Sequence, residues 1–230
     1  MIGKKSVLGI IPARGASKGV PRKNLKELCG KPLIAWTIEE AKKSAYIDTL
    51  VLSSEDDEIR KKAAELGCDV PFIRPHELAL DDTPGIEPIL HAISMLPNYD
   101  LVVMLQPTSP LRTAQDIDEC IEAYMEGEYD TCVSVSEVDK TPYWMYELNE
   151  DQKLLPILGE RVVLKRQDAP VIYELNGAVY VSSKESLIEK KSFLTDNTVG
   201  YIMQKNRSYD IDTELDFKIC ELLIRLENQT

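Results

Sequence analysis

The sequence lacks the features of a secreted, membrane-spanning or nucleic-acid-binding protein. Its five cysteines are odd in number and form no CxxC pair, which argues against a disulfide framework or a zinc site and predicts ordinary thiols in a reducing compartment. Its 27 Lys and Arg face 39 Asp and Glu, a net charge of -12, so non-specific attraction to nucleic acid or an anionic membrane is not expected. No apolar run approaches the roughly 20 residues that cross a bilayer, and the charged Arg14 comes too early for a signal peptide. We therefore expect a cytoplasmic protein.

Several familiar catalytic motifs are missing as well. The chain has no GxSxG nucleophile elbow, no GxxxxGK[ST] phosphate loop and no GxGxxG dinucleotide fingerprint. Its two histidines, His76 and His91, have no carboxylate or cysteine at metal-ligand spacing, so we interpret both as structural or surface residues. Any chemistry must come from less regular loops.

The first two-thirds of the chain alternates strand-like and helix-like segments. We predict strands at residues 6–12, 49–54, 70–74, 100–105, 176–183 and 199–204, and helices at 32–44, 56–67, 83–96, 113–127 and 212–227. Such alternation predicts a mainly parallel sheet covered by helices on both faces, an α/β fold of three layers. Ligands of such folds sit outside the carboxyl ends of the strands.

The alternation stops between about residues 138 and 173. This segment has proline-rich stretches and no clear helical pattern, so we predict an excursion with short antiparallel strands. The chain then divides into an α/β domain made of residues 1–138 and 173–230, and an inserted segment of residues 139–172.

The loop after the first predicted strand, residues 10–24 (IIPARGASKGVPRKN), gathers four cations and two glycines. Glycines let backbone N–H groups turn toward an anion, and the cations neutralise its charge. This composition fits a phosphate cradle, and on spacing alone it fits a solvated turn about equally well.

Two further loops carry candidate chemistry. Residues 106–112 (QPTSPLR) follow a predicted central strand, although this pattern is also common turn chemistry. Asp210 and Asp212 are separated by one residue, which in an extended chain sends both carboxylates to one side, where they could share Mg²⁺. Asp212 is equally plausible as the cap of the last helix.

Five motifs in order resemble the acylneuraminate cytidylyltransferase (CMP-sialic acid synthetase) family. They are IPARGASKGVPRKN, RPHELALDDTP, LQPTSPLR, RQDAPVIYELNGAVY and DIDTELD, and they span the chain from residue 11 to residue 216. Kdo cytidylyltransferases share the IPAR start but usually lack the Ser17-Lys18-Gly19 and Lys23-Asn24 elements, which favours a nonulosonic acid over Kdo.

The resemblance implies a Rossmann-like fold of the nucleotide-diphospho-sugar transferase type. It also implies the reaction of CTP with a nine-carbon sugar acid to give a CMP-sugar and pyrophosphate, with Mg²⁺ as cofactor. The anomeric hydroxyl would attack the α-phosphate, a transfer that depends on positioning and charge neutralisation. In relatives the segment corresponding to residues 139–172 is a dimerisation arm, so a homodimer is expected.

The resemblance also assigns roles to individual residues. Lys23, Arg14 and Asp212 would act in catalysis, with Lys23 stabilising the transition state. The resemblance assigns the binding of CTP to Arg14, Ser17, Lys18, Lys23, Asn24 and Arg74. It assigns the binding of the sugar acid to Gln106, Arg166, Asn176 and Tyr180, and the binding of Mg²⁺ to Asp210 and Asp212. Arg166 would bind the sugar carboxylate and could reach the partner's active site.

The chain departs from the family pattern at one place. Many sialic-acid members carry a lysine shortly after a His-Pro pair in the arm, where this chain reads Thr141-Pro142-Tyr143-Trp144. An aromatic side chain there favours a sugar with deoxy and acetamido groups, as in legionaminic or pseudaminic acid. A Kdo enzyme or a nucleotide-binding homologue without catalysis are the remaining alternatives.

Overall fold

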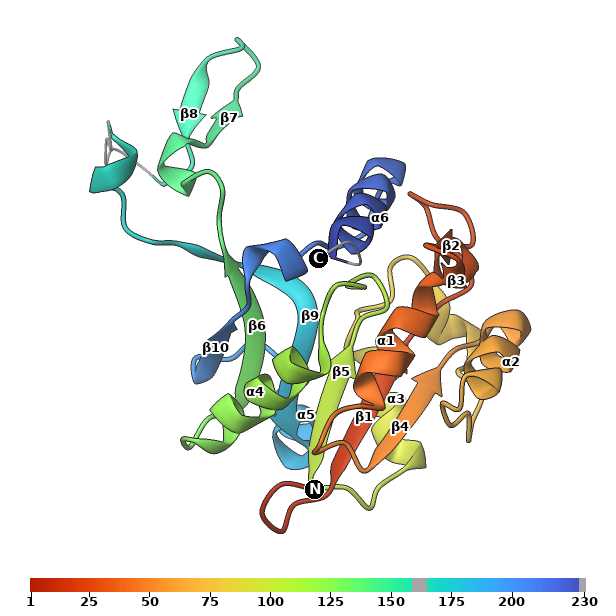
Figure 1. The fold of residues 1–230 in the computed structure, drawn as a ribbon. Coiled ribbons are helices and arrows are strands. Elements are labelled where there is room, and N and C mark those ends of the chain that lie inside the picture. The colour runs from red at the N-terminus through yellow and green to blue at the C-terminus, as the bar shows by residue number, and fades with distance from the viewer. Residues whose placement is uncertain (159–164, 228–230) are drawn as a thin grey trace.

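A six-stranded sheet forms the centre of the computed structural model, which describes residues 1–158 and 165–227 (Figure 1). The strand order is β10-β6-β9-β5-β1-β4, and β9 runs antiparallel to both of its neighbours while the other pairings are parallel. The strands are β1 (Val7–Pro12), β4 (Thr49–Ser53), β5 (Leu101–Leu105), β6 (Thr131–Glu137), β9 (Tyr173–Ser183) and β10 (Thr198–Ile202).

Helices cover both faces of this sheet. Because strand side chains alternate between faces, Val7 and Ile11 of β1 join one core while Leu8 and Ile10 join the other. The first core is closed by α1 (Leu33–Ala41), α2 (Asp57–Glu65) and α4 (Ala114–Met125), and the second by α3 (Glu87–Met95) and α5 (Lys184–Lys190). The predicted three-layer, mainly parallel α/β fold is therefore confirmed.

A third apolar cluster ties the basic loop to the C-terminal helix α6 (Glu214–Glu227). Val20 of the loop and Ile211, both fully buried, pack there with Phe217 of α6. The cluster also takes in Leu28 from the hairpin of β2 (Glu27–Leu28) and β3 (Lys31–Pro32). The cluster thereby holds the basic loop against the C-terminal helix beside the sheet.

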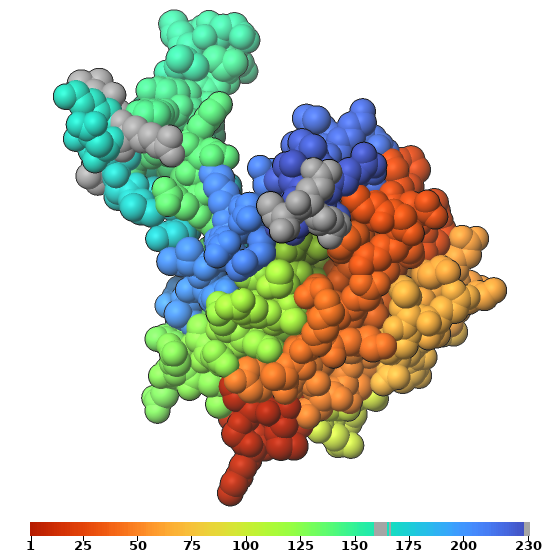
Figure 2. All heavy atoms as spheres, in the orientation of Figure 1, coloured from red at the N-terminus to blue at the C-terminus, as the bar shows by residue number. Residues whose placement is uncertain are grey.

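Between residues 138 and 173 the structure has a short antiparallel hairpin, in agreement with the short antiparallel strands predicted there. This segment contains β7 (Tyr146–Leu148) and β8 (Leu154–Pro156), together with the 3-10 turns η3 (Pro142–Trp144) and η4 (Arg166–Asp168). Figures 1 and 2 show the hairpin standing clear of the sheet and its helices. Its role as a dimerisation arm stays a prediction.

Three details of the sequence prediction were wrong or incomplete. Residues 70–74 form no strand. Pro71 has no N–H to donate, the bridge to β4 ends at Asp69, and the Arg74 N–H bonds the carbonyl of Ser54, one residue beyond β4. Helix α3 begins at Glu87 rather than near residue 83. The prediction also omitted β6 and α5.

Within residues 1–158 and 165–227, no helix has both the length and the apolar character that a bilayer crossing requires.

Candidate functional site

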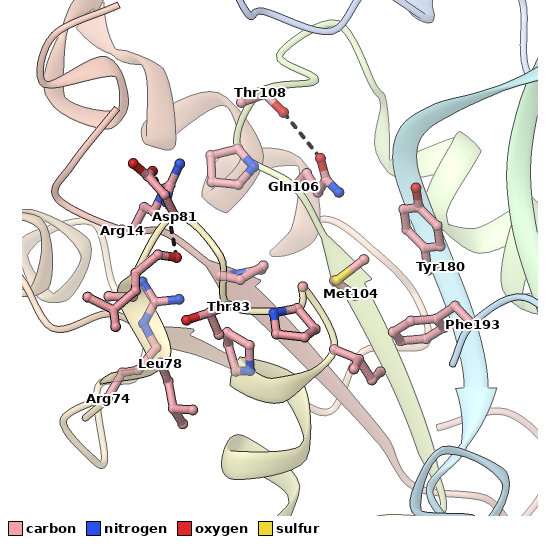
Figure 3. Close-up of a pocket in the computed structure, with 18 of the residues that line it drawn as sticks. Arg14, Arg74, Leu78, Asp81, Thr83, Met104, Gln106, Thr108, Tyr180 and Phe193 are labelled. Atoms are coloured by element: carbon pink, nitrogen blue, oxygen red, sulfur yellow. Dashed lines mark hydrogen bonds and ion pairs between the residues drawn. The ribbon is translucent and has the colours of Figure 1, made fainter. Parts of the chain in front are cut away.

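A pocket of about 570 Å³ lies where β1 and β5 end, the edge at which α/β sheets bind ligands. Its walls come from the basic loop, the segment around η2 (His76–Ala79), the loop after β5, strand β9 and the residues that follow α5. Figure 3 shows Arg14 and Arg74 on one side and Tyr180 and Phe193 on the other. Seven predicted site residues line it: Arg14, Ser17, Lys23, Asn24, Arg74, Gln106 and Tyr180.

At the cationic side, Asp81 engages two residues of the basic loop. Its carboxylate lies 2.8 Å from Arg14 and 3.0 Å from the Lys18 ammonium. The hydrogen bond from Lys18, followed by that from Arg14, lowers the pKa of Asp81. Lys18 is largely exposed and does not line the pocket, so its predicted contact with CTP would require it to leave Asp81.

Arg74 belongs to a buried ion pair that stiffens the same wall. Its guanidinium lies 2.7 Å from Glu55, and the side chains of Arg74 and Glu55 are 4% and 8% exposed. The other Glu55 oxygen accepts a 2.7 Å hydrogen bond from the Gly15 N–H. Burial opposes ionisation of Glu55, yet the Gly15 N–H and Arg74 together hold its pKa below the ordinary value. One carboxylate thus joins the basic loop to the pocket wall.

Lys23 connects the basic loop to the Asp210–Asp212 segment. Its ammonium donates to the Ile211 carbonyl at 2.5 Å and lies 3.3 Å from Asp212 Oδ1. The basic loop lies so close to the backbone of Asp212 that a Cβ added to Gly19 would be 1.9 Å from the Asp212 carbonyl oxygen. Asn24 fixes the loop from within by donating to the Arg14 carbonyl at 3.0 Å.

Asp210 is partly buried, and its Oδ1 has no hydrogen-bond partner among the described residues. Burial, and next the negative charge of Asp212, raise the pKa of Asp210. A partly buried carboxylate that has one oxygen without a hydrogen-bond partner and lies beside a second carboxylate suits a divalent cation. No three Asp, Glu, His or Cys side chains of the described chain gather into a metal site, so such a cation would draw further ligands from water or substrate.

The loop after β5 is held by Arg112, the largest fully buried side chain among those described. Arg112 donates to the carbonyls of Gln106 and Ala178 and to the Thr37 hydroxyl, and burial lowers its pKa to about 10. Arg112 therefore fixes the position of Gln106.

The far side of the pocket is apolar. Tyr180 of β9 packs against Phe193 with ring centroids 5.4 Å apart, and Met104 and Leu194 line the wall near them. Burial, and next the charge of Asp210, raise the pKa of Tyr180. This side suits ring carbons and acyl groups, whereas the cationic side suits phosphates.

Two predicted sugar contacts lie elsewhere. Asn176 lines a neighbouring hollow of about 260 Å³ with Asp210, and its amide already bonds Ser134 and Ser208. The backbone of Arg166 begins η4, while its side chain lies outside the described part of the chain. Sequence reasoning missed Asp81 and Lys191, which line the pocket, and Glu55, which binds Arg74 of its wall. The motif RPHELALDDTP contained Asp81, but no spacing signal separated it from ordinary loop acids.

The pocket thus has a cationic side that suits phosphates and an apolar side, and the carboxylate pair lies beside the basic loop. The chain belongs to the cytidylyltransferase family, whose model matches residues 8–228, and the predicted family is thereby confirmed.

Named relatives share this sequence over most of its length. It is 37% identical over 210 residues to an N-acylneuraminate cytidylyltransferase of Streptococcus agalactiae, which covers 90% of this chain and 51% of the relative. The chain thus spans about half the length of that relative. It is 33% identical over 230 residues to a CMP-N,N'-diacetyllegionaminic acid synthase of Legionella pneumophila, covering 97% of this chain and 98% of the relative.

Solved structures share the fold at low identity. A CMP:2-keto-3-deoxy-manno-octonic acid synthetase complexed with CTP superposes with a TM-score of 0.74 at 15% identity, covering 96% of this chain and 99% of the other. A 4-diphosphocytidyl-2C-methyl-D-erythritol synthase from Anaerococcus prevotii gives a TM-score of 0.67, also at 15% identity and over 96% of each chain. At this identity the likeness concerns the fold alone.

Proposed function

We propose that this chain transfers the cytidylyl group of CTP to a nine-carbon sugar acid of the sialic, legionaminic or pseudaminic type. The observation that carries the proposal is that one pocket has Arg14, Lys23 and Arg74 at one side and Tyr180 and Phe193 at the other. The named relatives, including a pseudaminic acid cytidylyltransferase of Campylobacter jejuni that is 30% identical over 227 residues (97% of this chain and 98% of the relative), support this class of substrate.

In the proposed reaction the anomeric oxygen of the sugar acid forms a bond to the α-phosphorus of CTP. The bond from that phosphorus to the bridging oxygen breaks, pyrophosphate leaves, and the anomeric hydroxyl gives up its proton. Lys23 is the residue we assign to the developing negative charge, because it is partly buried between the basic loop and the carboxylate pair. Arg14, Ser17 and Lys18 would hold the phosphates, and Arg74 the base end of the nucleotide.

We assign Asp210 and Asp212 to Mg²⁺, because the unpartnered Asp210 Oδ1 and the oxygen-only donor set fit a hard cation. The ion would neutralise phosphate charge when bound. Asp216 supports this pair by accepting hydrogen bonds from the Asp212 N–H at 3.1 Å and the Thr213 N–H at 2.7 Å. Its carboxylate thereby fixes the backbone from which Asp212 extends.

We also propose that residues 139–172 form the arm of a homodimer and that Arg166 binds the sugar carboxylate across the interface. The support is an apolar surface that would cost free energy if it stayed in water. Large apolar side chains are exposed along this segment: Trp144, Met145, Tyr146, Leu148, Leu154, Leu155, Ile157 and Leu158. Sedimentation equilibrium would test the assembly, and a monomer at micromolar concentration would refute it.

The function is tested by pyrophosphate release from CTP and Mg²⁺ with N-acetylneuraminate, diacetyl-legionaminate, pseudaminate and Kdo in parallel. Release with at least one nine-carbon acid, and more slowly with Kdo, is expected. CTP binding without release from any of the four would instead favour a binding protein.

Lys23→Ala examines the chemistry directly. We expect kcat to fall by at least about a hundredfold while the KM for CTP changes by less than about fivefold, because the lysine acts on charge that develops in the transition state. Lys26→Ala is the matched control, since Lys26 follows on the same loop and pairs with Glu214 away from the pocket. A loss confined to KM would show that Lys23 provides only uniform binding.

A further inference from the structure

Four cationic residues line the pocket, and three of them have a carboxylate partner. Arg14 pairs with Asp81, Lys23 with Asp212 and Arg74 with Glu55. The fourth is Lys191, whose ammonium makes no ion pair or hydrogen bond within the described part of the chain.

The backbone of Lys191 has a left-handed conformation that glycine adopts more readily than lysine. Lys191 caps the end of α5 with φ 51° and ψ 35°, the left-handed region, and its N–H bonds the Leu187 carbonyl. Glycine or asparagine is the usual choice at this position, because a Cβ is strained there. A lysine in such a place beside a pocket points to a use for its side chain.

The turn after Lys191 is rigid and continues along the pocket. The Ser192 hydroxyl donates to the Leu194 carbonyl at 2.8 Å and accepts from the Leu194 N–H at 2.9 Å. Phe193 between them packs on Tyr180. The base of the Lys191 side chain is therefore fixed next to the apolar wall, away from the cations that suit CTP.

We propose that Lys191 is a substrate-binding residue whose ammonium donates to an oxygen atom of the sugar acid. The proposal rests on the proposed function, since the second substrate is then an acid rich in oxygen acceptors. Among the described residues, Lys191 is the pocket cation without a carboxylate partner, and it lies two residues before Phe193 of the apolar side. An acidic substrate at that side therefore has an unpaired ammonium to bind. A flexible four-carbon stem lets this ammonium reach inward.

The test compares sugar-acid binding by the full-length wild type and Lys191→Gly, using calorimetry with N-acetylneuraminate, diacetyl-legionaminate and pseudaminate as probes. Glycine adopts the left-handed conformation without strain, so this variant removes the cation and should unfold at the same temperature as the wild type or higher. We expect binding of the accepted sugar acid to weaken about tenfold, the loss typical of a hydrogen bond from a charged donor. CTP affinity should stay within twofold.

Lys190→Ala is the matched control. It removes the same charge from the neighbouring residue, which pairs with Glu189 and does not line the pocket, and its sugar affinity should equal that of the wild type. An equal loss in both variants would reduce the effect to net charge and overturn the proposal, as would unchanged affinity in Lys191→Gly. A wild type that binds none of the three acids would overturn the proposed function together with this inference.

The salt dependence of sugar-acid affinity distinguishes the two kinds of oxygen atom that the Lys191 ammonium could bind. If it binds the carboxylate, the difference between wild type and Lys191→Gly shrinks as salt rises, because screening weakens charge pairs. A difference that does not depend on salt assigns the contact to a hydroxyl or acyl oxygen. Both results support binding of the sugar acid by Lys191.

Discussion

Glu55 is the residue whose replacement tests the electrostatic account of the pocket most directly. Its carboxylate accepts from the Gly15 N–H and from Arg74, both at 2.7 Å, and the side chain is 8% exposed. Glu55→Gln keeps the shape and one acceptor, but its amide NH₂ then faces the guanidinium, donor against donor. Arg74 remains buried without a counter-charge.

The expected cost follows from that burial. Removing one partner of a buried ion pair leaves an uncompensated charge and typically costs 3–5 kcal/mol, while the retained carbonyl oxygen recovers about 1 kcal/mol by accepting one hydrogen bond. We therefore expect Glu55→Gln to lower the free energy of unfolding by about 2–4 kcal/mol at pH 7. Glu58→Gln is the control, because Glu58 is exposed in its pair with Arg22, and it should cost less than about 1 kcal/mol.

The pH dependence of the free energy of unfolding shows whether the loss comes from the Glu55 carboxylate. The folded-state pKa of Glu55 lies below its unfolded value, so its contribution is fully present above the unfolded pKa of about 4.3 and is lost as pH falls through the folded pKa. Urea unfolding at pH 7, 5 and 4 should show the gap between wild type and Glu55→Gln narrowing only below about pH 4.5. A gap under 0.5 kcal/mol at pH 7, or one that is unchanged at the lowest pH, would refute the reasoning.

Two further substitutions probe the loop. Gly19→Ala places a Cβ against the Asp212 carbonyl oxygen, with 1.9 Å between them before relaxation. We expect a loss of about 1–3 kcal/mol in urea unfolding together with reduced kcat. Gly85→Ala meets open space and should leave the free energy of unfolding unchanged; because Gly85 lines the pocket, it is a control for stability alone. A stable and fully active Gly19→Ala would contradict the close approach. Asp81→Asn removes the carboxylate that pairs with Arg14 and Lys18, so calorimetry should show CTP binding a few-fold tighter at low salt. Asp82→Asn is the control for net charge. Weaker CTP binding in Asp81→Asn would mean that the carboxylate helps to hold the nucleotide.

The sheet could be predicted because its signal is local. The apolar runs that became β1, β4 and β5 end at polar loops, and buried parallel strands leave this pattern in a single sequence. β6 was missed although residues 131–137 are rich in β-branched side chains. Residues 70–74 also contain apolar side chains, but Pro71 and the irregular pairing beyond Asp69 leave them outside the sheet.

The site could be predicted only where a motif kept its residues close in sequence. The basic loop and the Asp210–Asp212 pair are compact motifs, and the structure brings them together through Lys23. Glu55 and Lys191 belong to no such motif: one is positioned by the fold of two distant loops, the other by the end of a helix that was not predicted. Asn176 stood within a motif, yet its amide serves the packing of β6 and β9.

The ion pairs also suggest how an acidic chain can receive an anionic nucleotide. Without ligand, Asp81 and Asp212 neutralise the basic loop from exposed positions, where a pair contributes at most about 1 kcal/mol in general and exchanges readily. Glu55 neutralises Arg74 from a buried position, where the pair is costly to break. Phosphates can therefore take over the cations of the loop at little expense, while the wall that carries Arg74 keeps its shape. The nucleotide would gain charge neutralisation from Arg14 and Lys23 and a fixed surface from Arg74, which is the division of roles that binding followed by transfer requires.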